Sequence, residues 1–189
     1  ELVLREGMLA DIEVVEQVKR QKASSDMATI VVANEQKIFD IVQKQLDLQI
    51  KVQQVQTAAA GTLISSHIAD LQQELGLAQE HNGTIDEQIR LTKELGDAQI
   101  EQARNALQAA ENALAASRAQ IALDEEKIET ARRLILITSD QAVIETQLNI
   151  IKDLTNKIKN LNADIPQLQA NVEAALAGVS RASTAAANN

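Results

Sequence analysis

The side chains best suited to chemistry in this sequence are two histidines, His67 and His81. Neither belongs to an HExxH or ExxH pattern, which would place zinc or di-iron ligands on one face of a helix. A histidine can act as a general base near neutral pH, but an isolated one predicts no such role. No Gly-x-Ser-x-Gly elbow and no glycine-rich phosphate loop occurs either. We therefore expect a protein that is not an enzyme.

One acidic cluster has the residue type that calcium prefers. It consists of Asp124, Glu125, Glu126 and Glu129, and carboxylate oxygens are hard ligands for Ca²⁺. The Asp-x-Asp-x-Asp-Gly spacing of an EF-hand loop is missing, and a solvated helix face is the simpler interpretation. These four residues are the calcium candidates, and the sequence predicts no other cofactor.

Composition limits the partners and the fold. The net charge of −9 argues against nucleic-acid binding, which needs basic surface to meet phosphates. No apolar run approaches the ~18 residues of a membrane span, and Leu134–Ile137 is the longest strongly apolar stretch. There is no cysteine, Phe39 is the one aromatic residue and Pro166 the one proline. Aliphatic residues with few breakers predict an all-α, elongated, antiparallel coiled-coil bundle with long helices.

Turn and capping signals divide the chain into segments. Asn82-Gly83 favours positive φ and ends a helix, while Thr84 with Glu87 fits a capping box that starts the next. Asn82-Gly83-Thr84 also matches the N-glycosylation pattern, which a short tripeptide often does by chance. A second boundary lies at 138–141, where Thr138, Ser139 or Asp140 could cap a helix after a turn or a kink. A weaker break is expected at 23–26.

These boundaries predict four helical segments in a single elongated bundle over residues 1–178. The segments are 2–22, 26–80, 85–137 and 140–178, and 179–189 is expected to be a small polar tail. At about 1.5 Å per residue, each of the two longest helices would reach about 80 Å.

Apolar residues recur every seven positions along the second half of the chain, as in a coiled coil. The first seam comprises Ile100, Leu107, Leu114, Ile121, Ile128 and Ile135. The second seam comprises Ile144, Ile151, Ile158, Ile165 and Val172. The phase shifts between them at the 138–141 boundary, and the second seam passes Pro166 in phase, which predicts a bend near Asn162.

The first half of the chain carries a further row with the same three-four spacing: Val31, Ile38, Ile41, Leu48, Val52 and Val55. Asp124 falls at a position of the first seam, where a buried carboxylate needs a partner. We expect it to set register against a basic residue or to mark an open stretch of the seam. Pairs at i,i+4, such as Glu129 with Arg133 and Asp153 with Lys157, are expected on solvent faces.

The two seams, the capped turn at 82–84, the acidity and the glutamine-rich composition resemble mature trichocyst matrix proteins of ciliates. Those are processed, acidic, heptad-rich polypeptides of extrusive secretory granules, and the start at Glu1 suits a processed product. The resemblance implies four-helix bundles that pack with copies of themselves and related helical subunits into a crystalline matrix. It also implies release from the granule at exocytosis, with expansion under calcium or pH control.

Two other classes of function stay open on the sequence. One is a coiled-coil scaffold or interaction module of another assembly, which the composition fits equally well. The other is a helical pore-forming toxin component, which needs a concealed apolar hairpin. Its one candidate is the short stretch 134–137.

Overall fold

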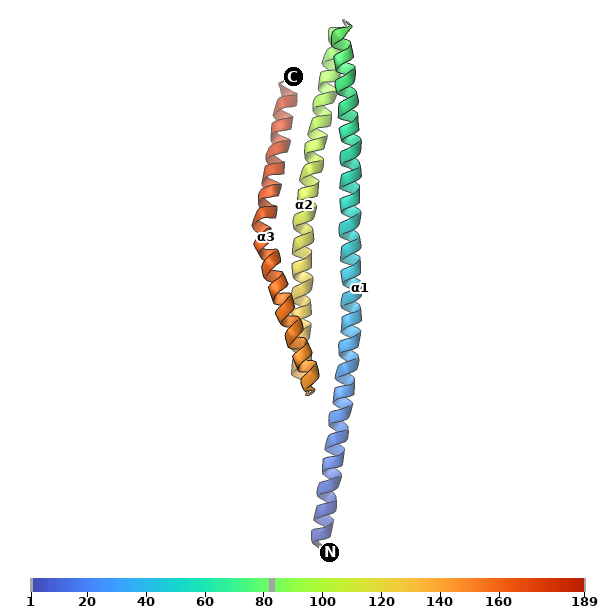
Figure 1. Cartoon of the computed structure of the whole chain (residues 1–189), viewed down its shortest axis with the longest axis vertical. Coiled ribbons are helices and arrows are strands. Elements are labelled where there is room, and N and C mark those ends of the chain that lie inside the picture. The colour runs from blue at the N-terminus through green and yellow to red at the C-terminus, as the bar shows by residue number, and fades with distance from the viewer. Residues whose placement is uncertain (1, 82–83, 189) are drawn as a thin grey trace. The chain divides into compact units, whose positions relative to one another are not determined.

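The chain forms three long helices in the residues that the structure describes (Figure 1). They are α1 (Leu2–Glu80), α2 (Ile85–Ile137) and α3 (Gln141–Ala187). The computed structural model describes the backbone of residues 2–81 and 84–188. It describes the side chains of the same ranges except 2–14, 21, 24–25 and 28–29. The predicted all-α helical bundle is confirmed.

Two of the predicted boundaries are wrong. α1 runs through 23–26 without interruption, because Ser and Asp cost a helix only about 0.5 kcal/mol each and no Gly or Pro stands there. α3 continues past Gly178 to Ala187, so the expected polar tail is helical. Ala186 and its neighbours are good helix formers, and one glycine costs only about 1 kcal/mol. Pro166 lies inside α3, and the bend near Asn162 stays a prediction.

Contacts divide the chain into two units, which are described separately below. Unit 1 consists of Glu1–Gln45 and Ile121–Asn160, and unit 2 consists of Leu46–Gln120 and Leu161–Asn189. Each unit contains part of every helix. Whether the two act together as the single bundle expected over 1–178 stays a prediction.

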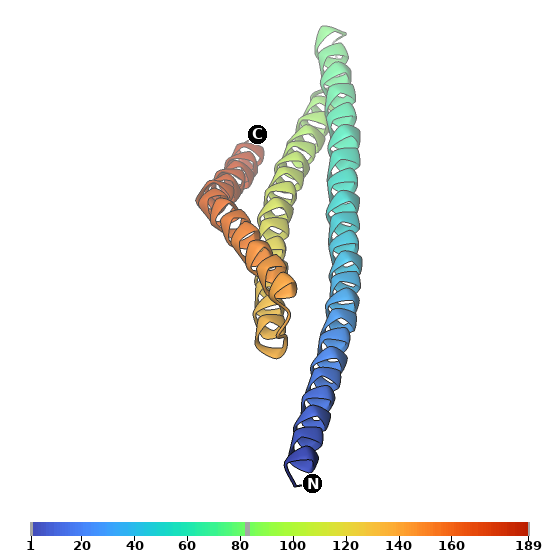
Figure 2. The same ribbon diagram turned by 60° about the horizontal axis from the view of Figure 1, so that its bottom comes forward.

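In unit 2, α1 and α2 pack as an antiparallel pair. Asn105 donates to the carbonyl of Thr57 at 3.0 Å, while Gln88, earlier in α2, donates to the carbonyl of Ala78 at 3.4 Å. The two ribbons of this unit lie side by side in both views (Figures 1 and 2). The core between them is aliphatic, as expected without aromatic residues: Leu71, Leu91 and Ala98, with Ile68, Leu75, Ala78 and Leu95 packed against them.

Glycine permits the close approach of α3 to α2 in the same unit. A Cβ built on buried Gly96 would lie 3.0 Å from the Cβ of Ala186. Real Cβ atoms are rarely that close, so any larger residue at 96 would push the end of α3 away. This contact also explains why the helix persists to Ala187, since packing stabilises a helix end that would otherwise fray.

Two other glycines have open space instead and provide a test of the helix assignments. Nothing lies within 4 Å of a Cβ built on Gly76 or Gly178. We expect Gly76→Ala and Gly178→Ala each to raise the free energy of unfolding by about 0.8–1.0 kcal/mol, the difference in helix propensity. Urea denaturation followed by circular dichroism measures this. A destabilised Gly178→Ala variant would contradict the extended α3.

In unit 1 all three helices share one core. Phe39 of α1, Ala131 and Leu134 of α2, and Gln147 and Ile150 of α3 line the same small cavity of about 50 Å³. Phe39, Ala131, Leu134 and Gln147 are buried. The α2–α3 connection therefore turns the chain back, and α3 packs on both earlier helices.

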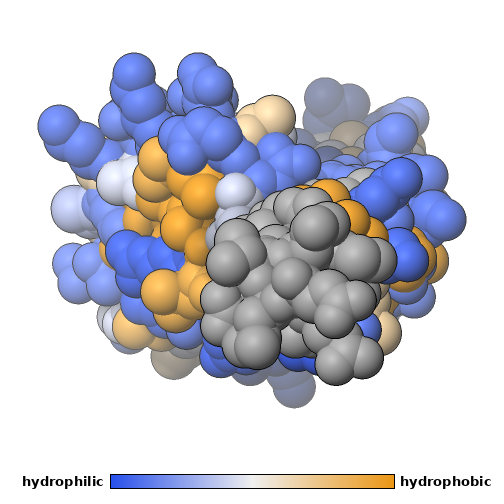
Figure 3. Space-filling model, turned by 90° about the horizontal axis from the view of Figure 1, so that it is seen from below, coloured by the Kyte–Doolittle hydropathy of each residue, from blue (hydrophilic) through white to orange (hydrophobic). Residues whose placement is uncertain are grey.

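The packing of α1 in unit 1 begins near Val32, which lines that cavity. Every described side chain of α1 from 15 to 31 is exposed. Leu136 and Ile137 at the end of α2 are exposed as well, at 84% and 56%. Seen from this end, apolar side chains lie at the surface among polar ones (Figure 3). Unit 1 thus leaves apolar surface uncovered where α1 has no helix beside it.

Candidate functional site

Both connections between helices carry side-chain caps. Thr84 Oγ1 accepts a hydrogen bond from the backbone N–H of Glu87 at 3.3 Å, so the predicted N-cap of α2 is confirmed. Asn82 and Gly83, the rest of that predicted turn, lie outside the described residues. At the second connection Asp140 is the cap, because its Oδ1 accepts from the N–H of Ala142 at 2.9 Å.

The first seam lies on α2 and the second on α3. Two contacts between these helices are seen, Gly96 against Ala186 in unit 2 and Asp124 against Lys157 in unit 1. Ile128 is buried, and the other residues of both seams are half-buried: Ile100, Leu107, Leu114, Ile121, Ile135, Ile144, Ile151, Ile158, Ile165 and Val172. Their further role as contacts between subunits stays a prediction.

Asp124 lies at the centre of an ion-pair network in unit 1. The carboxylate is 0% exposed. Lys157 Nζ of α3 lies 2.8 Å from its Oδ2, and Lys127 Nζ of α2 lies 3.9 Å from its Oδ1. Lys127 reaches α1 too, where its Nζ donates to Gln43 Oε1 at 3.1 Å and lies 5.9 Å from the centroid of the Phe39 ring.

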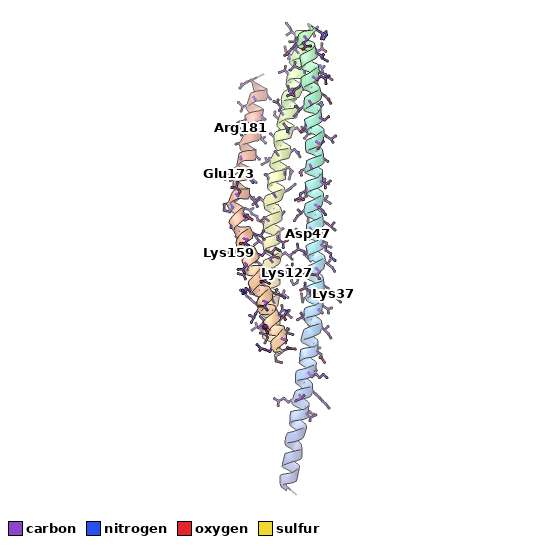
Figure 4. All side chains as sticks on the ribbon, in the orientation of Figure 1. Lys37, Asp47, Lys127, Lys159, Glu173 and Arg181 are labelled. Atoms are coloured by element: carbon purple, nitrogen blue, oxygen red, sulfur yellow. The ribbon has the colours of Figure 1, made fainter. Side chains whose placement is uncertain are left out.

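This network ties the three helices of unit 1 together at one level. Figure 4 shows Lys127 on α2 in the space toward α1. Of the two alternatives expected for Asp124, a basic partner is the one observed. Lys157 pairs across helices with Asp124, not with Asp153 as expected. Sliding α3 by one turn would take the closer ammonium, that of Lys157, away from the buried carboxylate and leave the longer contact with Lys127, at a cost of about 2 kcal/mol. The network therefore sets the register of α3 on α2.

The four calcium candidates do not converge. Asp124 points into the bundle, whereas Glu125, Glu126 and Glu129 are exposed, and Glu129 pairs with Arg133 at 3.3 Å as expected. Within the described parts of the chain, no three acidic or histidine side chains are grouped to hold a metal ion. Specific calcium binding stays a prediction.

Both histidines and a groove of unit 2 lie at the surface. His67 and His81 are both exposed. A groove of about 740 Å³ lies between α1 and α2 in unit 2, lined by alanines, Gly61, and hydroxyl and amide side chains such as Thr57 and Asn105. None of its lining residues is charged. It offers no acid, base or metal ligand.

A second row of apolar side chains lies on α1 outside its packed face. We call it the outer stripe of α1: Val31, Ile38 and Ile41 in unit 1, and Leu48, Val52 and Val55 in unit 2. These side chains are between 39% and 65% exposed. The inner face of α1 uses the residues one position later, Val32, Phe39 and Leu46, which are buried or half-buried.

A sequence signal for this second stripe exists. Apolar residues stand next to each other at 30–32, 38–39 and 41–42. A helix with one buried face has apolar residues three and four apart. When two adjacent apolar residues recur every seven positions, as at 31–32 and 38–39, the helix has apolar side chains on two of its sides. The outer stripe therefore has the three-four spacing of a coiled-coil seam, and its side chains are exposed in each unit.

Together the fold and these surfaces define an all-α helical bundle with exposed apolar side chains along α1. Comparison of the chain with protein-family models, curated proteins and solved structures finds no match. A search of the described helices for a segment both long and apolar enough to cross a membrane finds none.

Proposed function

We propose that the chain is a structural subunit that packs side by side with other helical subunits into an ordered matrix. The observation that carries this proposal is the outer stripe of α1. Its residues have the three-four spacing of a coiled-coil seam, yet they lie exposed along a helix whose opposite face is already packed.

The energetics favour burial of this stripe in an assembly. Fully burying a Val, Leu or Ile side chain gains about 1.5–3 kcal/mol, so covering six half-exposed ones gains roughly 6 kcal/mol on this side alone. A partner helix contributes a similar amount from its own seam. The two contributions add up to roughly 12 kcal/mol, which lies in the upper half of the roughly 4–15 kcal/mol that association costs.

The matrix we propose is that of an extrusive secretory granule, discharged outside the cell at exocytosis, as the resemblance to trichocyst matrix proteins implies. The acidic surface supports a role for calcium. With a net charge of −9, neighbouring subunits repel each other through their carboxylates. Calcium or acid would weaken that repulsion without any dedicated site, and the spacing between subunits would change.

Electron microscopy of the native material, with and without millimolar calcium, tests this function. We expect an ordered array whose repeat changes when calcium is added, and magnesium at the same concentration serves as a control for general screening. Dispersed particles under both conditions would overturn the proposal and favour a stand-alone scaffold or interaction module.

A further inference from the structure

The groove between α1 and α2 lies wholly within unit 2 and is open to solvent. One row of its wall on α2 has the three-four spacing of a coiled-coil seam. We call it the groove row: Gln102, Ala106, Ala109, Ala113 and Ala116. Ala106, Ala109 and Ala113 are exposed, so the described chain leaves this wall uncovered. The groove is therefore a place where one more helix can pack.

The polar groups on the floor of the groove already have partners. Asn105 donates to the carbonyl of Thr57 at 3.0 Å, and a Cβ built on Gly61 would lie 3.0 Å from the same amide nitrogen. Gln102 Nε2 donates to Ser65 Oγ at 3.4 Å. An occupant therefore does not have to supply hydrogen bonds to the floor, and small uncharged side chains suit it.

Charge is missing from both walls of the groove. None of the lining residues is charged, and the stretch 52–69 of α1 contains no Asp, Glu, Lys or Arg, although 24% of the chain is charged. Between 102 and 120 of α2, the charged residues are Arg104, Glu111 and Arg118, seven apart and exposed. They occupy f in the heptad of the groove row, which points away from a and d. Two copies of this acidic protein can therefore meet here without bringing like charges together.

The groove row reads the same in both directions once Gln120, the next residue at this spacing, is included. Its antiparallel pairs are Gln102 with Gln120, Ala106 with Ala116, and Ala109 with Ala113. Alanine meets alanine over the middle, where small side chains let two helices approach closely. Amide meets amide at both ends, where each can donate and accept. Opposed helix macrodipoles favour this direction over the parallel one.

We propose that the groove of unit 2 binds α2 of a second copy of this chain, antiparallel and about a twofold axis, so that each copy places its α2 in the groove of the other. A twofold interface needs a surface that complements itself, as the groove row does. The inference goes beyond the proposed function, because the groove and the outer stripe use different sides of α1. In unit 2, Gln54, Ala58 and Gly61 line the groove, whereas Val52 and Val55 belong to the stripe.

Sedimentation velocity of the purified full chain tests this dimer. We expect a monomer–dimer equilibrium whose Kd rises at least about a hundredfold in the variant Ala109→Glu with Ala113→Glu, because each new carboxylate faces another across the axis. The control Ala115→Glu with Ala122→Glu adds the same charge at exposed positions of α2 outside the groove row and should keep the native Kd. A native chain that stays monomeric at every concentration, or a control that weakens equally, would overturn the proposal.

A charge swap tests the register across the axis. Because residue 109 faces residue 113 of the second copy, Ala109→Lys with Ala113→Glu places two ammonium–carboxylate pairs between the copies. This variant should dimerise at least about tenfold more tightly than the double-Glu variant. The same Kd for both variants would contradict the antiparallel register.

Cysteine cross-linking tests the direction of the two helices. The chain has no cysteine, so Gln102→Cys and Gln120→Cys each introduce one thiol. A mixture of the two variants should form disulfide-linked dimers and neither variant alone should, because equivalent residues of the two copies lie about 27 Å apart at 1.5 Å per residue. Cross-linking of each variant with itself, but not in the mixture, would contradict the inference.

The dimer and the matrix can fail separately. If native material forms ordered arrays that respond to calcium while the purified chain stays monomeric, the proposed function stands and this inference fails. If the dimer forms and cross-links as described but native material shows no ordered array, the inference stands and the matrix function fails.

Discussion

Replacing Lys157 by Met is expected to lower the free energy of unfolding by about 2 kcal/mol. Removing one partner of a buried ion pair costs roughly 3–5 kcal/mol, because a charge stays buried without compensation. The effect should be smaller here, since the Lys157 side chain is 46% exposed and Lys127 stays 3.9 Å from Asp124. Urea denaturation followed by circular dichroism measures the change.

The double variant Asp124→Leu with Lys157→Met distinguishes this account from a simple loss of contacts. Replacing both charges by apolar side chains removes the penalty, so stability should return to within about 1 kcal/mol of the native protein. Lys152→Met, an exposed change on the same helix, should stay within about 0.5 kcal/mol. If Lys157→Met behaves like Lys152→Met, the network does not hold α3 in register.

Replacing Ile38 and Ile41 by Asp is expected to prevent assembly while leaving the subunit folded. The substitutions remove the free energy that burial of the two isoleucines would contribute to assembly. Burying two carboxylates in their place adds a desolvation cost of several kcal/mol. The concentration needed for assembly should rise by at least about a hundredfold, as measured by sedimentation. Helix content should not change, because both side chains are more than half exposed in the subunit.

The matched control for that variant is Ala115→Asp with Ala122→Asp. It adds the same charge on exposed positions of α2 and should assemble at nearly the native concentration. Assembly of the Ile38, Ile41 variant at the concentration of this control would show that the outer stripe is not an interface.

Local signals predicted part of the fold well, for physical reasons. α2 begins at residue 85 and ends at 137, as expected, because Thr84 caps its start and Asp140 caps the helix that follows it. The predicted break at 23–26 was wrong because Ser-Ser-Asp occurs both in helix caps and in helix interiors. The predicted end of α3 was wrong because Ala186 packs against Gly96. A local sequence pattern cannot show a contact between residues so far apart in the chain.

In the candidate site, too, local signals were predicted and contacts between distant residues were not. The sequence placed Asp124 on a seam and predicted either a basic partner or an open stretch there. That the partner is Lys157 depends on the register between α2 and α3. Likewise, the three-four spacing of Val31, Ile38 and Ile41 could be seen in the sequence. Val32 and Phe39, one position after Val31 and Ile38, are also apolar, so the sequence offered two candidate stripes for the buried face. Which stripe faces inward is decided by packing of the whole unit, so the exposed seam emerged only from the fold.

Thiol labelling tests the central claim, that the outer stripe is buried in the assembled matrix, most directly. The chain has no cysteine, so Ile38→Cys places a single reporter on the stripe and Ala122→Cys a control on exposed α2. We predict that a maleimide labels both positions rapidly in dispersed subunits, and that assembly slows labelling at 38 far more than at 122. Labelling at 38 that is equally fast before and after assembly would contradict the claim.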